Sequence, residues 1–363
     1  MDALMFKKLL ATAIQKGASD IHLQVGASPM LRINGELFQI KYPPLTAKQT
    51  YAVMDEILSQ SITQTPKTGS LSEIDVAYNL EGYGRFRANI YLQRGSYNIV
   101  LRAIPTEIKS FEDLNLPVVL EKVSMLRRGL VLVVGATGNG KSTTVASMIE
   151  FINRNRRTHI ITIEDPIEFV FHNDKSVISQ REVGIDTETF SGATEAAMRQ
   201  DPDIIFVGEM RDRETVETAI KAAETGHLVL STMHTMDSIN SIARLVGFYS
   251  ADQETSVRKR LSNCLVSVVA QRLIPRKDLA ARIPAVEVLW VTQGIRDCIC
   301  DASKTNEILL YIEKGREIYG MQTFDQHLLT LVRSGMIDME TAKQAANKPD
   351  EFERSIMLEN NYN

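Results

Sequence analysis

This sequence of 363 residues has few cysteines, and neither sign of charge is in large excess. Three cysteines are too few for a disulfide scaffold and fit reduced thiols. The 41 lysines and arginines face 45 aspartates and glutamates, so the basic excess typical of a nucleic-acid binder is missing. No run reaches the roughly 18 apolar residues of a membrane span, and the amino-terminal stretch does not read as a signal peptide. The sequence therefore predicts a cytoplasmic protein of two or three domains without a nucleic-acid partner.

The first 104 residues have the pattern of a small α+β domain. Apolar residues at helical spacing predict two helices, and short apolar runs separated by turn signals predict five strands. The expected helices cover residues 3–16 and 46–60, and the expected strands cover residues 21–23, 30–33, 37–40, 73–78 and 84–92. Residues 105–117, which are polar and bounded by prolines, are predicted to be a linker.

Residues 118–363 have a different pattern, in which apolar runs alternate with helical stretches. Such runs are typical of strands buried on both faces, and the alternation predicts a doubly wound parallel sheet. The runs lie at residues 130–134, 159–163, 204–207, 228–231 and 285–290. The helical stretches lie at residues 142–153, 190–200, 212–225, 237–246 and 252–273. The fold class is therefore α/β, with a smaller α+β domain in front.

A phosphate-binding loop follows the first of these runs. The sequence G-A-T-G-N-G-K-S at residues 135–142 fits the G-x-x-x-x-G-K-[ST] pattern, between a predicted strand and a predicted helix. Backbone N–H groups of such a loop cradle phosphates, the lysine reaches the β- and γ-phosphates, and the serine hydroxyl binds Mg²⁺. ATP and Mg²⁺ are thus the expected cofactors. The candidate nucleotide-binding residues are Gly135, Thr137, Gly138, Asn139, Gly140, Lys141, Ser142 and Thr143.

Carboxylates follow two other predicted strands at the ends where open α/β sheets build their sites. Glu209 comes after the strand at 204–207 and is a candidate to hold Mg²⁺ through water or to position the attacking water. Asp203 lies at the wrong end of that strand. Glu164 and Asp165 follow the strand at 159–163, and by spacing alone either is eligible as a general base. Asp165 has helix capping as its alternative role.

Two histidines flank the strand at 228–231. His234 lies at its carboxyl end, where an imidazole is placed to sense the γ-phosphate, and His227 lies at its amino end. A single histidine at a strand end is more often structural than functional. Spacing alone leaves both roles open for His234.

Taken together, these blocks resemble the type IV pilus retraction ATPases, the PilT/PilU family of the secretion-ATPase superfamily. The resemblance covers about residues 3–345 and includes Gly17–Leu23, the Asp box Ile163–Glu168, Gly208–Asp212 and the His box Thr225–Thr235. It implies a PAS-like domain followed by a RecA-like ATPase domain, in a homo-hexamer that powers pilus retraction. It also implies a peripheral location at the inner membrane. The implied partners there are a pilus platform protein and a paralogous retraction ATPase.

The resemblance also implies roles for single residues. Glu164 corresponds to the catalytic base. Glu209 corresponds to the Walker B carboxylate, which binds Mg²⁺ through water. Arginines of the first domain act on the nucleotide phosphates in this family, so that hydrolysis depends on how the two domains are placed. The implied catalytic residues are Glu164, Glu209, His234, Arg85, Arg87 and Arg102, with His227 at the other end of the His box.

One feature departs from the sequence pattern of the retraction ATPases, and another distinguishes them from the assembly ATPases. The retraction motif Ala-Ile-Arg-Asn-Leu-Ile reads Gly-Ile-Arg-Asp-Cys-Ile at residues 294–299, which gives weight to a PilU-like accessory ATPase as the alternative function. Pilus assembly ATPases carry a four-cysteine zinc insertion. Three cysteines cannot form that tetrahedral site, which disfavours an assembly role.

Overall fold

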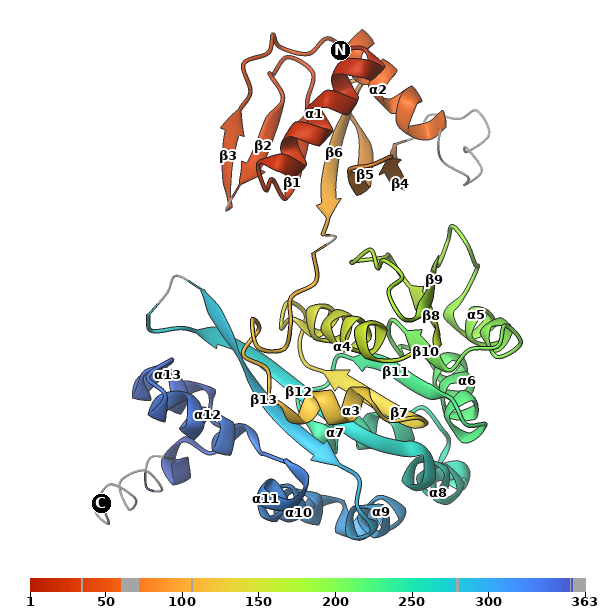
Figure 1. The fold of residues 1–363 in the computed structure, drawn as a ribbon, viewed down its shortest axis with the longest axis vertical. Coiled ribbons are helices and arrows are strands. Elements are labelled where there is room, and N and C mark those ends of the chain that lie inside the picture. Colours follow the sequence, from red (N-terminus) through yellow and green to blue (C-terminus); the bar gives the residue numbers. More distant parts are fainter. Residues whose placement is uncertain (34, 60–71, 106, 279–280, 353, 355–363) are drawn as a thin grey trace. The chain divides into compact units, whose positions relative to one another are not determined.

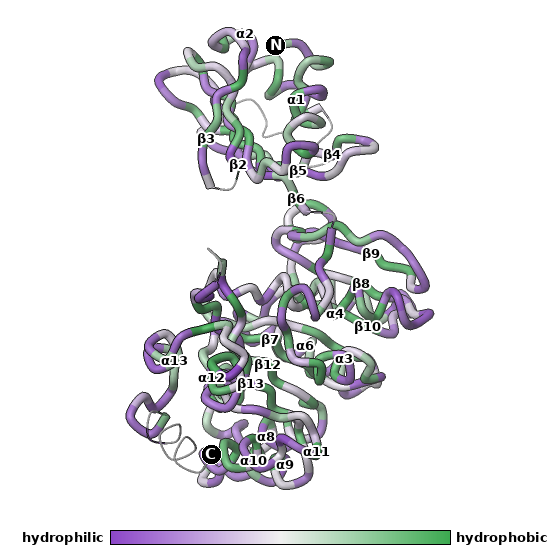
Figure 2. Tube along the Cα trace, turned by 60° about the vertical axis from the view of Figure 1, so that its left-hand side comes forward, coloured by the Kyte–Doolittle hydropathy of each residue, from purple (hydrophilic) through white to green (hydrophobic). Residues whose placement is uncertain are grey.

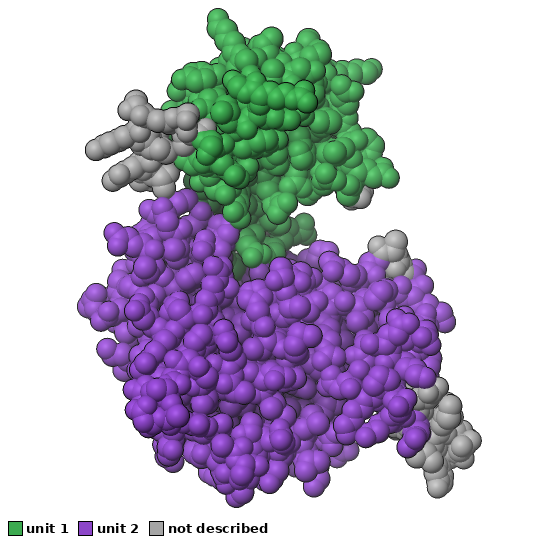
Figure 3. Space-filling model, turned by 180° about the vertical axis from the view of Figure 1, so that it is seen from behind, with its two compact units in different colours: residues 1–107, 168–171 green, residues 108–167, 172–363 purple. Residues whose placement is uncertain are grey.

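The computed structural model describes residues 1–33, 35–59, 72–105, 107–278, 281–352 and 354. The chain divides into two units, coloured separately in Figure 3. Unit 1 comprises residues 1–107 and 168–171, and unit 2 comprises residues 108–167 and 172–363. Within the described residues, no helix combines the length and the apolar character needed to cross a membrane.

Unit 1 is an antiparallel sheet of six strands in the order β3-β2-β1-β6-β5-β4, with α1 and α2 packed on it (Figure 1). Buried Ile21, Leu101 and Ala88 lie opposite one another across β1, β6 and β5. The elements are α1 (Ala3–Gln15), β1 (Asp20–Leu23), β2 (Met30–Ile33), β3 (Glu36–Gln39), α2 (Ala47–Ser59), β4 (Glu73–Leu80), β5 (Gly84–Gln93) and β6 (Ser96–Ile104). Each predicted element is present, and residue 60 of the second predicted helix lies outside the described residues. Strand β6 was not predicted.

Unit 2 contains a sheet of seven strands in the order β13-β12-β7-β11-β10-β8-β9. All neighbouring pairs are parallel except β12 and β13, so the predicted α/β class of this unit is confirmed. The strands are β7 (Gly129–Val134), β8 (His159–Glu164), β9 (Val177–Glu182), β10 (Ile204–Val207), β11 (Leu228–Met233), β12 (Leu265–Pro275) and β13 (Arg282–Trp290). The α-helices are α3 (Val119–Ser124), α4 (Lys141–Asn155), α5 (Phe190–Ala197), α6 (Arg213–Glu224), α7 (Ser238–Val246), α8 (Glu254–Cys264), α9 (Gln293–Cys300), α10 (Ile308–Lys314), α11 (Arg316–Tyr319), α12 (Phe324–Arg333) and α13 (Met339–Ala345).

The predicted helix over residues 252–273 was wrong in its second half. Helix α8 ends at Cys264, and the chain continues directly as β12, which pairs with β7 on one side and with β13 on the other. Val268, Val269 and Ala270 are fully buried there. A strand buried on both faces shows no alternation, so its apolar run reads like the extension of a buried helix. The polar strand β9 at the sheet edge was also not predicted.

Residues 108–117, from the predicted linker, belong to unit 2 and pack against its helix α4. Phe111 is buried, and its ring centroid lies 5.4 Å from that of Phe151. The hydroxyl of Ser147 donates a hydrogen bond to the carbonyl of Lys109 at 2.8 Å. The part of this segment that lies outside unit 2 is therefore residues 105–107.

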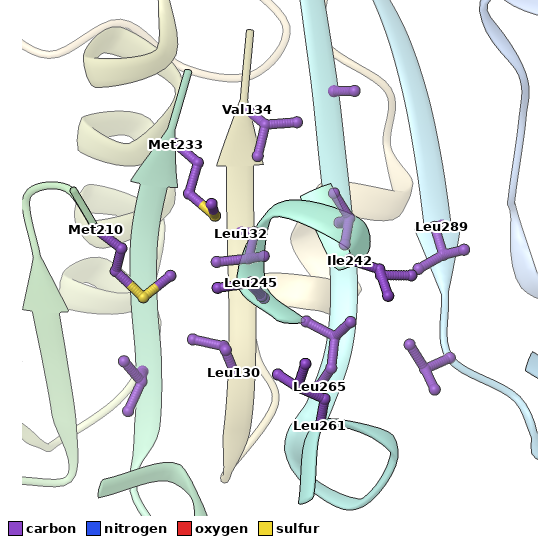
Figure 4. Packing of buried hydrophobic residues seen from close by; sticks show 14 of the residues in the cluster. Leu130, Leu132, Val134, Met210, Met233, Ile242, Leu245, Leu261, Leu265 and Leu289 are labelled. Atoms are coloured by element: carbon purple, nitrogen blue, oxygen red, sulfur yellow. The ribbon is translucent and has the colours of Figure 1, made fainter. Parts of the chain in front are cut away.

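The core of unit 2 fixes the central strands. Figure 4 shows Leu130, Leu132 and Val134 of β7 beside Ile242 and Leu245 of α7, all of them buried. In Figure 2 these central strands are coloured as hydrophobic. Every residue of β7 and of β11 is buried. The loops that leave the carboxyl ends of these strands therefore start from fixed positions.

Candidate nucleotide-binding site

Four parallel strands bring the predicted site residues to one edge of the sheet. The phosphate-binding loop leaves β7, His234 follows β11, Glu209 follows β10, and Glu164 ends β8. These strands are neighbours in the order β7-β11-β10-β8. Because the carboxyl ends of parallel strands share one edge, the four segments lie side by side there.

The loop has the backbone that its glycines predict. Gly138 and Gly140 have φ values of 79° and 80°, in the left-handed region that side chains disfavour. Lys141 begins α4, and its Nζ donates to the carbonyls of Gly135 at 2.8 Å and Ala136 at 3.1 Å. The amino end of this helix of 15 residues, with Ser142 and Thr143 in its first turn, offers N–H groups and a favourable dipole to an anion.

A glutamine on β12 supports this loop and was not predicted. The Nε2 of Gln271 donates to the carbonyl of Asn139 at 2.7 Å, and its Oε1 accepts from the Thr144 hydroxyl at 2.7 Å. Gln271 is buried, and its backbone carbonyl lies 2.4 Å from where a Cβ on Gly135 would stand. Only glycine therefore fits at position 135. An amide in the middle of an apolar strand was the available sequence signal, because buried amides need partners.

His234 connects the loop lysine to Glu209. The Nδ1 of His234 lies 3.4 Å from Lys141 Nζ, and its Nε2 lies 3.3 Å from Glu209 Oε2. Since an ammonium group only donates, Nδ1 is the acceptor and Nε2 carries the proton that Glu209 accepts. The hydroxyl of Thr137 also lies 3.4 Å from Nδ1. The imidazole therefore links Lys141 of the loop to Glu209 after β10.

Glu209 is held ionised by its neighbours. Burial by itself would raise the pKa of this carboxyl, but the Arg211 guanidinium, which is bonded to Oε1, and His234 hold the pKa below its usual value. Arg211 was not predicted as a site residue. Its signal was its place in the block Gly208–Asp212, directly after β10.

The structure distinguishes Glu164 from Asp165 by their surroundings. Glu164 is buried, and its Oε1 accepts hydrogen bonds from the Thr162 hydroxyl at 2.6 Å and from Gln180 Nε2 at 3.2 Å. Asp165 is exposed. A general base has to be held in one orientation, which favours Glu164 over Asp165.

The three arginines lie on the sheet of unit 1. Arg87 and Arg102 are direct cross-strand neighbours on β5 and β6, and Arg85 precedes Arg87 on the same face of β5. The Nε of Arg102 lies 2.9 Å from Asp20 Oδ1, and the Nε of Arg87 lies 3.4 Å from Asp75 Oδ1. Their action on a nucleotide stays a prediction.

The other two polar residues lie at the opposite ends of their strands. His227 precedes β11, and its Nδ1 is 2.9 Å from the carbonyl of Ala222, near the end of α6. Asp203 precedes β10, and its carboxylate accepts a hydrogen bond from the backbone of His159 at 2.9 Å. Both contacts are structural.

The donor set suits Mg²⁺ rather than a protein-enclosed metal. Ser142 and Glu209 offer a hydroxyl and an ionised carboxylate, the oxygen ligands that Mg²⁺ takes together with phosphates and water. In the described part of the chain, no group of three or more histidine, cysteine, aspartate or glutamate side chains is arranged to hold a metal. Binding of Mg²⁺ by Ser142 and Glu209 stays a prediction.

Comparisons with known proteins agree on the family. The profile of the family "Type II/IV secretion system protein" matches residues 2–358. The type IV pilus retraction ATPase PilT of Pseudomonas aeruginosa is 42% identical over 345 residues, 95% of this chain and 99% of PilT. The type IV pilus ATPase PilU of the same organism is 38% identical over 353 residues, 97% of this chain and 91% of PilU.

Comparison with a solved structure supports the same family. The crystal structure of the pilus retraction motor PilT with bound ADP superimposes with a TM-score of 0.83 at 41% sequence identity. The match covers 98% of this chain and 99% of that chain. The chain therefore belongs to the type II/IV secretion system protein family, as a PilT-type ATPase.

Proposed function

We propose that this protein is a homo-hexameric motor that hydrolyses ATP to power retraction of type IV pili. The observation that carries the proposal is the alignment of the phosphate-binding loop, His234, Glu209 and Glu164 along one sheet edge. Likeness to PilT over nearly the whole of both chains supports pilus retraction as the output. The proposal includes an inner-membrane platform protein as the partner and a peripheral location at that membrane.

The chemistry follows from the contacts at the sheet edge. The β- and γ-phosphates bind at the amino end of α4, where Lys141 exchanges its carbonyl partners for phosphate oxygens. Ser142, through its hydroxyl, and Glu209, through water, would hold Mg²⁺, which would neutralise part of the phosphate charge. Glu164 takes the proton of the attacking water as that water approaches the γ-phosphate in line. His234 senses whether a γ-phosphate is bound through its contact with Lys141.

The arginines of unit 1 supply the mechanical coupling in this proposal. Arg85, Arg87 and Arg102 place positive charge on the γ-phosphate in the transition state, as an arginine finger does. Because they belong to a different unit from the phosphate-binding loop, hydrolysis requires one placement of the two units. Each turnover is thereby linked to a rotation of one unit against the other.

Replacement of the proposed base tests the assignment. We expect Glu164→Gln to lower the rate of phosphate release by about 10²–10⁴-fold, while ADP binding stays within about twofold. Asp165→Asn is the matched control, because it neutralises the adjacent exposed carboxylate and should hydrolyse ATP near the wild-type rate. Wild-type turnover by Glu164→Gln, or an equal loss in both variants, would refute the role of Glu164.

The altered sequence of residues 294–299 supports an accessory ATPase as the second candidate function. Gly294, Asp297 and Cys298 replace residues of the retraction motif, and PilU is also similar over most of this chain. Deletion of the gene in cells that retain another retraction ATPase separates the two functions. Surface pili that no longer retract support the motor, and unchanged retraction speed and force support the accessory role.

A further inference from the structure

One part of the sheet face in unit 1 has no covering helix among the residues that the structure describes. Helices α1 and α2 contact each other on this face, and α2 contacts β6 and β4 (Figure 1). Beyond α1, over the hairpin of β2 and β3, the same face bounds a groove of about 630 Å³. The groove is therefore the space that a third helix would occupy on this sheet.

The floor of the groove is apolar and belongs to the core side of the sheet. Leu31 is buried in the same cross-strand row as Ile21, and Phe38 lies directly opposite Leu31 on β3. Phe38 nevertheless remains 48% exposed, because none of the described helices or strands covers it. Met5 and Leu9 of α1 form the wall, at the spacing of one helix face. The groove thus offers an unfilled extension of the hydrophobic core of unit 1.

The rim of the groove carries charge of one sign. Three exposed lysines line it, Lys8 on α1, Lys16 at the C-cap of α1 and Lys41 after β3. Within the described part of the chain, no aspartate or glutamate lines the groove. An occupant with acidic groups along its solvent edge would therefore meet complementary charge at both walls.

We infer that this groove binds an acidic amphipathic helix of a partner protein. The groove runs along α1 from Met5 to the C-cap residue Lys16, about 16 Å at 1.5 Å per residue, which fits about 11 residues or three helical turns. The partner's apolar face covers the exposed Phe38 and Met5, and its carboxylates face the lysines, in the helix-in-groove mode of recognition. A lipid surface fits less well, because the apolar floor is concave and membranes take protruding apolar side chains. The inference concerns a different surface from the nucleotide site and does not depend on the proposed function.

The test uses the full-length protein and two designed peptides. Each has 14 residues with leucines on one helical face, and the opposite face carries glutamates in the acidic peptide and lysines in the basic one. Fluorescence anisotropy should show at least about tenfold tighter binding of the acidic peptide. Lys8→Glu combined with Lys41→Glu should reverse the preference, whereas Lys48→Glu, on α2 outside the groove, should not.

Phe38→Asp is the decisive variant, and the chain provides its matched control. Leu37 is the next residue on β3, is also 48% exposed, and points to the other face of the sheet. We expect Phe38→Asp to weaken binding of the acidic peptide by at least about tenfold and Leu37→Asp to leave it within about twofold. ATP hydrolysis and circular dichroism should be unchanged in the Phe38 variant. Equal binding of both peptides, or equal effects of both variants, would overturn the inference.

Photo-crosslinking identifies the natural occupant and excludes the alternatives. A photoreactive amino acid is placed at position 38 in the native host, and the crosslinked peptide is sequenced. An acidic amphipathic segment of another protein supports the inference. Crosslinks to lipid, with binding to phosphatidylglycerol vesicles that Phe38→Asp abolishes, would overturn it in favour of a membrane contact. Crosslinks to a second copy of this chain would overturn it in favour of a subunit interface.

Discussion

Replacing Gln271 by leucine should weaken nucleotide binding, although Gln271 is not one of the predicted nucleotide-binding residues. Gln271 joins β12 to the phosphate-binding loop at the carbonyl of Asn139 and to α4 at the hydroxyl of Thr144. Leucine fills a similar volume but offers neither hydrogen bond. The loop is then free to leave the conformation in which its N–H groups converge on phosphate.

The magnitude follows from the two polar groups that lose their partner. An unsatisfied buried polar group costs about 1–3 kcal/mol. The Thr144 hydroxyl can rotate toward a backbone carbonyl of its own helix, which places the sum near the lower end, at about 2 kcal/mol. If nucleotide binding restores the loop, this cost appears in the dissociation constant, and 1.4 kcal/mol corresponds to a factor of ten. The affinity for ADP should therefore fall by about thirtyfold.

Titration with a fluorescent ADP analogue measures this loss, and thermal unfolding reports whether the variant is folded. Gln322→Leu is the control, because Gln322 Nε2 also donates to a backbone carbonyl of unit 2, that of Val286 at 2.8 Å, away from the loop. It should lower stability without changing ADP affinity. A folded Gln271→Leu protein that binds ADP within twofold of the wild type would refute the reasoning.

Three further predictions concern packing and pH. In Gly294→Ala, the new Cβ would lie 2.5 Å from the Tyr311 ring, so urea titrations should show a free energy of unfolding lower by about 1–3 kcal/mol. Adding Tyr311→Leu should recover this stability, and no recovery would contradict the contact. Burial lowers the pKa of His327 to about 4, so the native state takes up its proton less readily than the unfolded chain. Stability is therefore lost as pH falls from about 6.5 toward 4, by about 2 kcal/mol between pH 7 and pH 5, and His327→Gln should lack this loss when unfolding is followed by Trp290 fluorescence. Burial raises the pKa of Glu287 above its usual value, so stability is lost as pH rises through the raised value. Urea titrations should therefore show that the unfolding free energy of Glu287→Gln minus that of the wild type is larger at pH 8 than at pH 5. The same difference at both pH values would contradict an ionisable Glu287.

Local patterns in the sequence predicted much of the site. The phosphate-binding loop is a continuous segment whose glycines, lysine and serine each have a local reason, and its strand and helix are both present as expected. Placing Glu209 and His234 at the carboxyl ends of parallel strands required only the rule that such ends share one edge. These predictions needed no knowledge of which distant residues touch.

Contacts between distant residues could not be predicted in this way. Gln271 and Thr144 are 127 positions apart, and only the pairing of β12 with β7 brings them together. The choice between Glu164 and Asp165 was open for the same reason. It depends on which side chain points into the sheet, where Gln180 of the unpredicted strand β9 contacts Glu164. Tertiary pairing, rather than local propensity, decides such positions.

The altered retraction motif divides into anchoring residues and surface residues. Ile295 and Ile299, which match the motif, are buried on α9. Arg296, which also matches, donates to the carbonyls of Ser262 and Asn263 at the end of α8, where a cation is favourable. The matching residues therefore fasten α9 to α8.

The changed residues leave this anchor intact. Gly294 makes room for the Tyr311 ring, Cys298 is buried, and Asp297 alone among the three is exposed. The departure from the motif thus reaches the surface as one added negative charge rather than as a lost helix. Because α8 continues directly into β12, the anchored segment is joined through one strand to Gln271 and the phosphate-binding loop. A motor needs such a connection between its nucleotide and its surface, so the altered motif is compatible with a retraction motor, and the accessory role stays the second candidate.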